Sequence, residues 1–137
     1  MNLTRNLPAL LAGLALTITV SIARAEISGK VDLFCESSDV VGCTETLCLQ
    51  GTPGSFDLSH YMLIDVESKA VRGLNQEGES FSSPVLNTDV TDKAFILQGI
   101  DDHRGWTMGI DRGTGKMTVS STSADVNFMI TGTCTER

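Results

Sequence analysis

A lysine framed by glycines and threonines, in the segment GIDRGTGKMT at positions 109–118, could belong to a phosphate-binding loop. A Walker A loop requires Gly-x4-Gly-Lys followed by Ser or Thr. Here Ile110 occupies the position of the first glycine, and Met117 replaces the hydroxyl residue that would bind Mg²⁺. The residues that follow alternate as in a strand, instead of beginning the helix whose N-terminus would hold the phosphate. The segment is therefore predicted to be the turn of a β-hairpin.

The cysteines are the next candidates for chemistry. Cys35, Cys43, Cys48 and Cys134 are separated by seven, four and 85 residues. Zinc sites typically carry C-x2-C knuckles, which this spacing does not provide. An even number of cysteines behind an export signal favours disulfides. Oxidised cysteines supply neither metal ligands nor a nucleophile.

No other residue pattern indicates catalysis or a metal site. His60 is predicted on the apolar face of a strand, and the segment 101–104 (DDHR) is typical of a charged turn. Glu77 and Glu79 flank a glycine, as at the tip of a hairpin, and no Gly-x-Ser-x-Gly elbow is present. We therefore expect a protein that is not an enzyme and that takes no metal and no cofactor.

The best candidates for a binding site are His103, Arg104 and Trp106, which gather at one loop and the start of the next strand. Tryptophan and arginine are enriched at binding hot spots, and loops on rigid scaffolds commonly carry recognition. Trp106 is the only tryptophan of the chain, and its alternative role is core packing. The sequence predicts a ligand-binding or partner-binding site here.

The elements that must position these residues are strands. Apolar and polar residues alternate with a period of two, which is typical of half-buried antiparallel strands. Turn signals recur about every ten residues. A helix is expected over one or two turns at most, and its best place is Thr88–Asp92, with Thr88 or Asp89 as its cap. We predict a single all-β domain over residues 26–137, a small antiparallel meander barrel with a sandwich as the alternative. The alternating segments are 30–35, 57–66, 106–111, 116–121 and 125–134.

Two hairpin turns share a sequence pattern. The segments MLIDVESKAV (62–71) and MGIDRGTGKM (108–117) both contain Met-x-Ile-Asp-x-x-Ser/Thr. In each, a strand is expected to end at the aspartate, whose carboxylate can accept backbone N–H bonds in the turn. A second strand is expected to begin after Lys69 or Gly115.

The strand pattern also favours one of the three possible disulfide pairings. Cys35 shares a face with Val31 and Leu33 on the first strand, and Cys134 shares a face with Phe128 and Ile130 on the last. These two strands become neighbours if a barrel closes. The pairing Cys35–Cys134 is therefore predicted, and a second disulfide, Cys43–Cys48, is predicted to close a short loop.

The N-terminus has the pattern of a signal peptide over residues 1–25. Arg5 precedes an apolar run from Leu7 to Ile22, and Ala23-Arg24-Ala25 is a cleavage site. The apolar run is short for an uncleaved anchor, so no stable membrane span is expected after cleavage. Cleavage would leave eight basic and 17 acidic residues, a net charge of −9. This charge disfavours nucleic acid and favours a basic partner, and the expected compartment is the periplasm or the exterior.

Four short motifs of the chain resemble those of a known group of proteins. They are FC in the first strand, GC and LC after it, W-x-x-x-I-D-R-x-T-G-K in a late hairpin, and G-x-C at the end. In these the chain resembles small exported β-barrel proteins of Gram-negative bacteria, most of which have no assigned function. It is more loosely similar to the periplasmic inhibitors of c-type lysozyme, which are small acidic β-barrels with an early cysteine strand. The expected function is binding of an unknown ligand, and the alternative is inhibition of a basic secreted hydrolase such as lysozyme.

Overall fold

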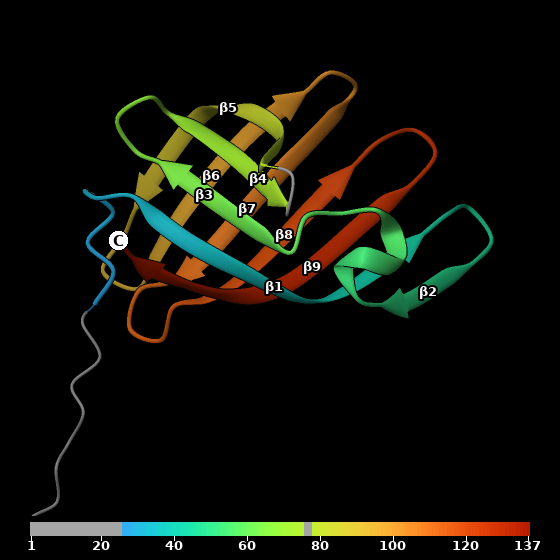
Figure 1. The fold of residues 1–137 in the computed structure, drawn as a ribbon, viewed down its shortest axis with the longest axis horizontal. Helices are drawn as coiled ribbons and strands as arrows, with labels where there is room; N and C mark the ends of the chain where they lie inside the picture. Colours follow the sequence, from blue (N-terminus) through green and yellow to red (C-terminus); the bar gives the residue numbers. More distant parts are fainter. Residues whose placement is uncertain (1–25, 76–77) are drawn as a thin grey trace, which may run out of the picture.

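The computed structural model describes residues 26–75 and 78–137. The predicted signal peptide, residues 1–25, lies outside the described residues, and so does Glu77. Figure 1 shows the strands of the described part wrapped around one core. Their bounds are β1 (Leu33–Cys43), β2 (Cys48–Gly51), β3 (Tyr61–Asp65), β4 (Ala70–Asn75), β5 (Gly78–Val90), β6 (Ala94–Asp101), β7 (Arg104–Asp111), β8 (Lys116–Thr122) and β9 (Asn127–Glu136), with one 3₁₀ turn, η1 (Pro53–Phe56).

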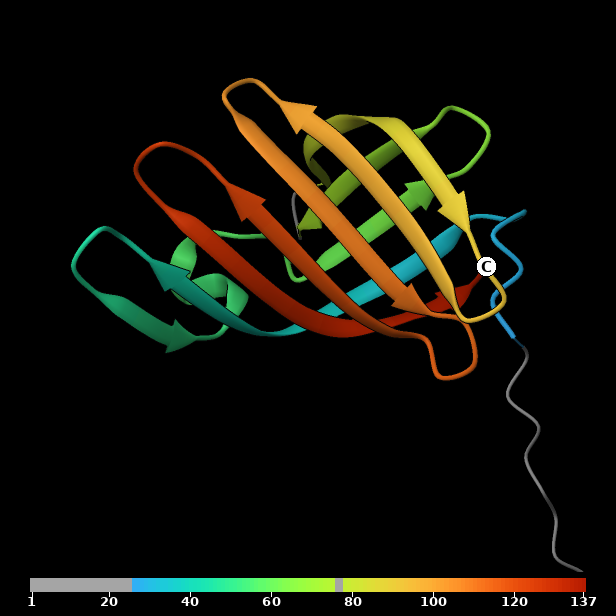
Figure 2. The same cartoon turned by 180° about the vertical axis from the view of Figure 1, so that it is seen from behind.

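The strands form a closed antiparallel barrel. Its order is β1-β3-β4-β5-β6-β7-β8-β9, and pairing of β1 with β9 closes the ring. The remaining strand, β2, pairs with the second half of β1, from Val40 to Cys43. Figures 1 and 2 show this β1–β2 hairpin extending beyond the barrel as an arm. The predicted meander barrel is confirmed, and the sandwich alternative is wrong.

Both predicted disulfides are present. Cys35 and Cys134 face each other directly across the β1–β9 seam, with an S–S distance of 2.01 Å. Cys43 and Cys48 face each other across the β1–β2 arm, with an S–S distance of 2.03 Å. The pairing follows from two predicted features together: the alternation placed Cys35 and Cys134 on the inner faces of their strands, and closure of the barrel brings the first and last strands side by side.

The two related hairpin turns are confirmed as well. The Asp111 carboxylate accepts hydrogen bonds from the Thr114 backbone N–H at 2.7 Å and its hydroxyl at 2.8 Å. The Asp65 carboxylate accepts the backbone N–H of Ser68 at 2.8 Å. Each turn ends at a residue with positive φ, 52° at Lys69 and 71° at Gly115. The glycine-rich segment at 109–118 is therefore the hairpin between β7 and β8.

The predicted helical turn at Thr88–Asp92 is wrong. Thr88 and Val90 belong to β5 and pair with Leu97 and Phe95 of β6. The tight turn that follows is fixed by the Thr91 hydroxyl, which accepts the backbone N–H of Ala94 at 2.9 Å. Strand pairing over this stretch therefore overrides the local capping signal.

Two side-chain placements also differ from the prediction. His60 is exposed and precedes the strand, which begins at Tyr61 with Met62 as its first buried residue. Val31 is 42% exposed and precedes β1, whose inward row begins at Leu33. In both cases the apolar alternation was extended past the end of the strand.

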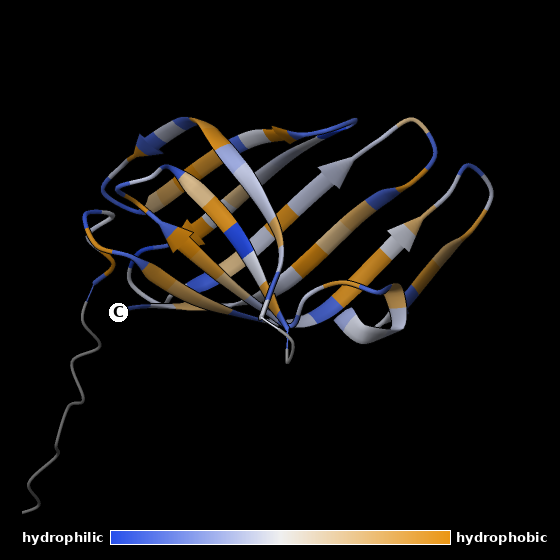
Figure 3. Cartoon of the chain, turned by 45° about the horizontal axis from the view of Figure 1, so that its top comes forward, coloured by the Kyte–Doolittle hydropathy of each residue, from blue (hydrophilic) through white to orange (hydrophobic). Residues whose placement is uncertain are grey.

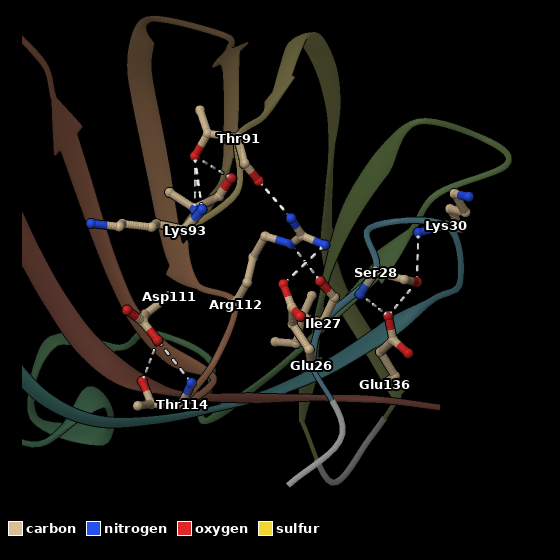
Figure 4. A network of polar contacts seen from close by, with 11 residues as sticks. Glu26, Ile27, Ser28, Lys30, Thr91, Lys93, Asp111, Arg112, Thr114 and Glu136 are labelled. Atoms are coloured by element: carbon tan, nitrogen blue, oxygen red, sulfur yellow. Dashed lines mark hydrogen bonds and ion pairs between the residues drawn. The ribbon is translucent and has the colours of Figure 1, made fainter.

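The two ends of the barrel differ. The closed end holds the start of β1, the end of β9 and the turns that follow β3, β5 and β7. There the N-terminal segment crosses the barrel: Ile27 is buried against the core, and its carbonyl accepts a 2.7 Å hydrogen bond from Arg112 Nε. Figure 4 shows the network around Arg112, in which Thr91 and Glu26 also take part. The open end holds the end of β4 and the turns after β6 and β8.

Packing follows the alternation along each strand. Figure 3 shows apolar and polar bands alternating along the strands. Apolar residues that face inward toward the closed end form a buried core, among them Leu33, Ile64, Phe95, Ile110 and Met117. Within the described residues, no helix is long and apolar enough to cross a membrane.

Candidate functional site

A cavity of about 230 Å³ lies inside the barrel toward its open end. Its walls are apolar side chains from five different strands, of which Met62, Val71, Met108 and Val119 are buried and Ile130 is half-buried. Its more exposed rim includes Leu58 and Phe81, and Phe128 lies half-buried beside them. The cavity thus passes from the core of the barrel to solvent.

Aromatic rings line this cavity because they lie flat over glycines of neighbouring strands. A Cβ at Gly99 would lie 2.3 Å from the Trp106 ring, and a Cβ at Gly73 would lie 2.1 Å from the Phe81 ring. Such rings covering strand glycines fix the local register of a sheet. Since the rings lie along the wall, they leave the space of the cavity open.

Trp106 is held in place by a second contact. Its indole N–H donates a 2.8 Å hydrogen bond to the hydroxyl of Ser83, which is almost fully buried on β5. A buried indole needs such a partner for its N–H. Trp106 is therefore part of the cavity wall, and its orientation is fixed.

Arg104 lies at the rim of the cavity. Its guanidinium carbon is 5.3 Å from the centroid of the Phe128 ring, which is a cation–π contact. Asp101, its partner in the β6–β7 register, also lines the cavity. Among the described residues that line it, only Arg104 and Asp101 are charged, and their charges are opposite.

His103 lies outside the cavity lining. Its side chain is 69% exposed on the β6–β7 turn, where Nδ1 is 3.1 Å from the carboxylate of Asp102. The structure thus brings Arg104 and Trp106 of the predicted site together at one cavity and leaves His103 on the outer side of the turn.

Ser37 is a cavity residue that the sequence analysis did not single out. It lines the cavity and is 3% exposed, and its hydroxyl has no hydrogen-bond partner within residues 26–75 and 78–137. Its backbone N–H donates to the carbonyl of His60 at 2.8 Å, which fixes the strand at this point. Continuing the alternation of Leu33 and Cys35 by two residues would have placed this serine inside the barrel.

The carboxylates with lowered pKa lie at the closed end. The Thr114 hydroxyl and backbone N–H lower the pKa of Asp111, and the backbone N–H of Ser68 lowers that of Asp65. Hydrogen bonds from the Ser28 hydroxyl and backbone lower the pKa of Glu136. These shifts follow from turn and terminus contacts, which stabilise the ionised form.

The arrangement can hold an apolar molecule with a polar atom near Ser37. Over residues 26–75 and 78–137, no group of three or more His, Cys, Asp or Glu side chains is placed to hold a metal ion. Comparison with known proteins finds no family model, no curated protein and no solved structure that matches the chain.

Proposed function

We propose that the protein is an exported, non-enzymatic binding protein that holds a small apolar molecule in the open end of its barrel. The observation that carries this proposal is the cavity of about 230 Å³, with apolar walls and aromatic rings held against them. An apolar protein cavity of about 150 Å³ binds benzene. With the same cavity volume per ligand atom, the larger cavity of this protein would hold a molecule of about ten heavy atoms.

Export is supported by two features of the chain. The apolar N-terminal run ends at Ala23-Arg24-Ala25, and all four cysteines are joined in disulfides, which form in oxidising compartments. We expect the protein recovered from a bacterial periplasm to begin at Glu26 when its N-terminus is determined by mass spectrometry. A soluble product that begins at Met1 would contradict export.

Binding is testable through the single tryptophan, because Trp106 lines the cavity. We expect 4-propylphenol, which has ten heavy atoms, to cause a saturable change in Trp106 emission and to raise the melting temperature. Val119→Phe places a ring in the cavity and should abolish both effects. The matched control is Val90→Phe, because Val90 is 46% exposed and is not among the lining residues. Equal binding by both variants would contradict a cavity site.

A second candidate function is inhibition of a basic hydrolase such as a c-type lysozyme. The observation that favours it is a row of exposed carboxylates, Glu36, Asp39 and Glu45, along β1 and the tip of the arm. Such a charged surface would speed association with a basic protein in a salt-dependent way. A lysozyme activity assay at low and high ionic strength tests this candidate, and full lysozyme activity at both would exclude it.

A further inference from the structure

We propose that the ligand of the barrel cavity is a neutral molecule with one hydroxyl or carbonyl group, and that this group enters first and hydrogen-bonds to the Ser37 hydroxyl. This inference rests on the proposed binding function and adds the chemical class of the ligand and its orientation.

Ser37 differs from the other serines of the cavity in having a buried hydroxyl with no hydrogen-bond partner at all among the described residues. Ser83 Oγ accepts the Trp106 indole N–H, and Ser59 Oγ is 2.5 Å from the hydroxyl of Ser80. Ser121 is only half-buried, so it can be reached by solvent. Ser37 is buried and lines the cavity, and its hydroxyl has no hydrogen-bond partner in the described part of the chain. A buried polar group without a partner is unfavourable, and a ligand atom that bonds to it would remove that cost.

The change from buried to exposed residues along the cavity determines the orientation of the ligand. Ser37 lies in its buried part with Met62 and Met108, whereas Phe81 and Arg104 lie at its more exposed rim. A ligand whose polar group reaches Ser37 would therefore keep its apolar body among the methionines, valines and aromatic rings of the wall.

The charges around the cavity exclude an ionised group at the buried end. Within residues 26–75 and 78–137, Asp101 and Arg104 are the only charged residues that line the cavity, they lie at its rim, and they are opposite in sign. Burying an ionised group beside Ser37 with no charged partner would be strongly unfavourable. A neutral hydroxyl or carbonyl needs only the single hydrogen bond that Ser37 can make, since a hydroxyl both donates and accepts.

A matched pair of probes tests the inference on the full, oxidised protein. 4-Propylphenol and 4-propyltoluene differ only in a hydroxyl that replaces a methyl group. We expect wild-type protein to bind the phenol about tenfold more tightly, the effect of one buried hydrogen bond. In Ser37→Ala this preference should fall to less than about twofold, with 4-propyltoluene bound as well as before. Ser120→Ala, which removes an exposed serine of β8, is the control and should keep the tenfold preference.

The outcomes separate this inference from the proposed function. If both probes bind the wild type equally and Ser37→Ala changes nothing, the cavity binds apolar molecules but the role of Ser37 is wrong. If neither probe binds, the binding function itself is wrong. A third probe, 4-propylbenzoate, tests whether the head group must be neutral. If this anion binds more tightly than the phenol and the tighter binding is lost in Arg104→Met, the ligand has a charged head group at the rim. That result would overturn the inference.

Discussion

Trp106 on β7 reaches across β6 to Ser83 on β5: the indole N–H donates to the serine hydroxyl at 2.8 Å while the ring lies over Gly99. Gly99 pairs with Trp106 on one side and Val85 on the other. Three strands are thus linked by one side chain at the wall of the cavity. The absence of a side chain at Gly99 is what permits the crossing.

Gly99→Ala is expected to disturb this crossing. The added Cβ would lie 2.3 Å from the Trp106 ring and 2.4 Å from the backbone carbonyl oxygen of Pro84. The Trp106 ring can move aside, but a shift of the backbone at Pro84 would disturb the pairing of β5. We therefore expect a loss of about 1–3 kcal/mol of stability. The displaced ring should also change the Trp106 emission spectrum. Gly105→Ala is the control, because no atom lies within 4 Å of a Cβ there. Equal denaturation midpoints for the two variants would show that the crossing is not needed.

The two disulfides are expected to differ in their effect on stability. The Cys35–Cys134 bond closes a loop with a sequence separation of 99, and the Cys43–Cys48 bond one with a separation of 5. In the chain-entropy model the first stabilises by about 4–5 kcal/mol and the second by about 2 kcal/mol. Urea unfolding of the two double Cys→Ser variants measures the difference. A larger loss from the arm disulfide would mean that the arm, and not the seam, limits stability.

Asp111 should contribute to stability in a pH-dependent way. Its folded-state pKa is lowered, chiefly by the Thr114 hydroxyl, so the ionised form is favoured in the folded protein. This stabilisation is present above the unfolded-state pKa and is lost as the pH falls through the folded-state pKa. The advantage of wild type over Asp111→Asn should therefore shrink between about pH 6 and about pH 2.

Melting temperatures across this pH range test the Asp111 prediction. The control is Asp125→Asn in the β8–β9 turn, where Ser123 makes the side-chain bonds to the backbone. A stability difference between wild type and Asp111→Asn that is constant with pH would contradict the role assigned to the carboxylate.

Arg112 is expected to hold the N-terminal segment across the closed end. Its side chain is 19% exposed, donates to the carbonyls of Ile27 at 2.7 Å and Thr91 at 2.6 Å, and is 3.2 Å from the Glu26 carboxylate. Arg112→Met leaves these acceptors without their donor, and we expect stability to fall by about 1–3 kcal/mol.

Amide hydrogen exchange at Ile27 gives a local measure of the same prediction, because its N–H donates to the Arg112 carbonyl at 2.9 Å. Exchange there should accelerate in Arg112→Met more than in Arg137→Met, which changes an exposed arginine. Unchanged exchange at Ile27 in both variants would show that burial of its side chain alone holds the segment.

The period-two alternation was sufficient to predict the barrel and both disulfides. Each of these depends on which face of a strand a residue occupies, and that follows from neighbouring positions. The Asp111 turn was predicted from its residue types, because aspartate can accept backbone N–H bonds within a turn. Strand ends were harder to predict: the alternation at His60 and Val31 continues past the last residues that pair, and only the neighbouring strands decide where pairing stops.

The candidate site was predicted only in part, because it depends on register between strands. Arg104 and Trp106 were identified by residue type, whereas the relation of Trp106 to Gly99 and Ser83 depends on which residues oppose one another across three strands. The β1–β9 and β5–β6 pairs both contain register shifts, between Ser37 and Asp39 and between Val85 and Asn87. A single chain does not reveal where such irregularities fall, and they determine which side chains meet inside the barrel.

The β1–β9 seam has a consequence for how the chain folds. Most other neighbours in the barrel are consecutive hairpins, which form within microseconds, but the seam pairs Leu33 with Glu136 and Cys43 with Asn127. Contacts between such distant residues carry a high loop-closure entropy and slow folding. The ring cannot be completed until β9 has emerged from the machinery that synthesises the chain. Until then β1 and β8 are open sheet edges, able to pair with other chains, and the partly made barrel is the species most exposed to aggregation.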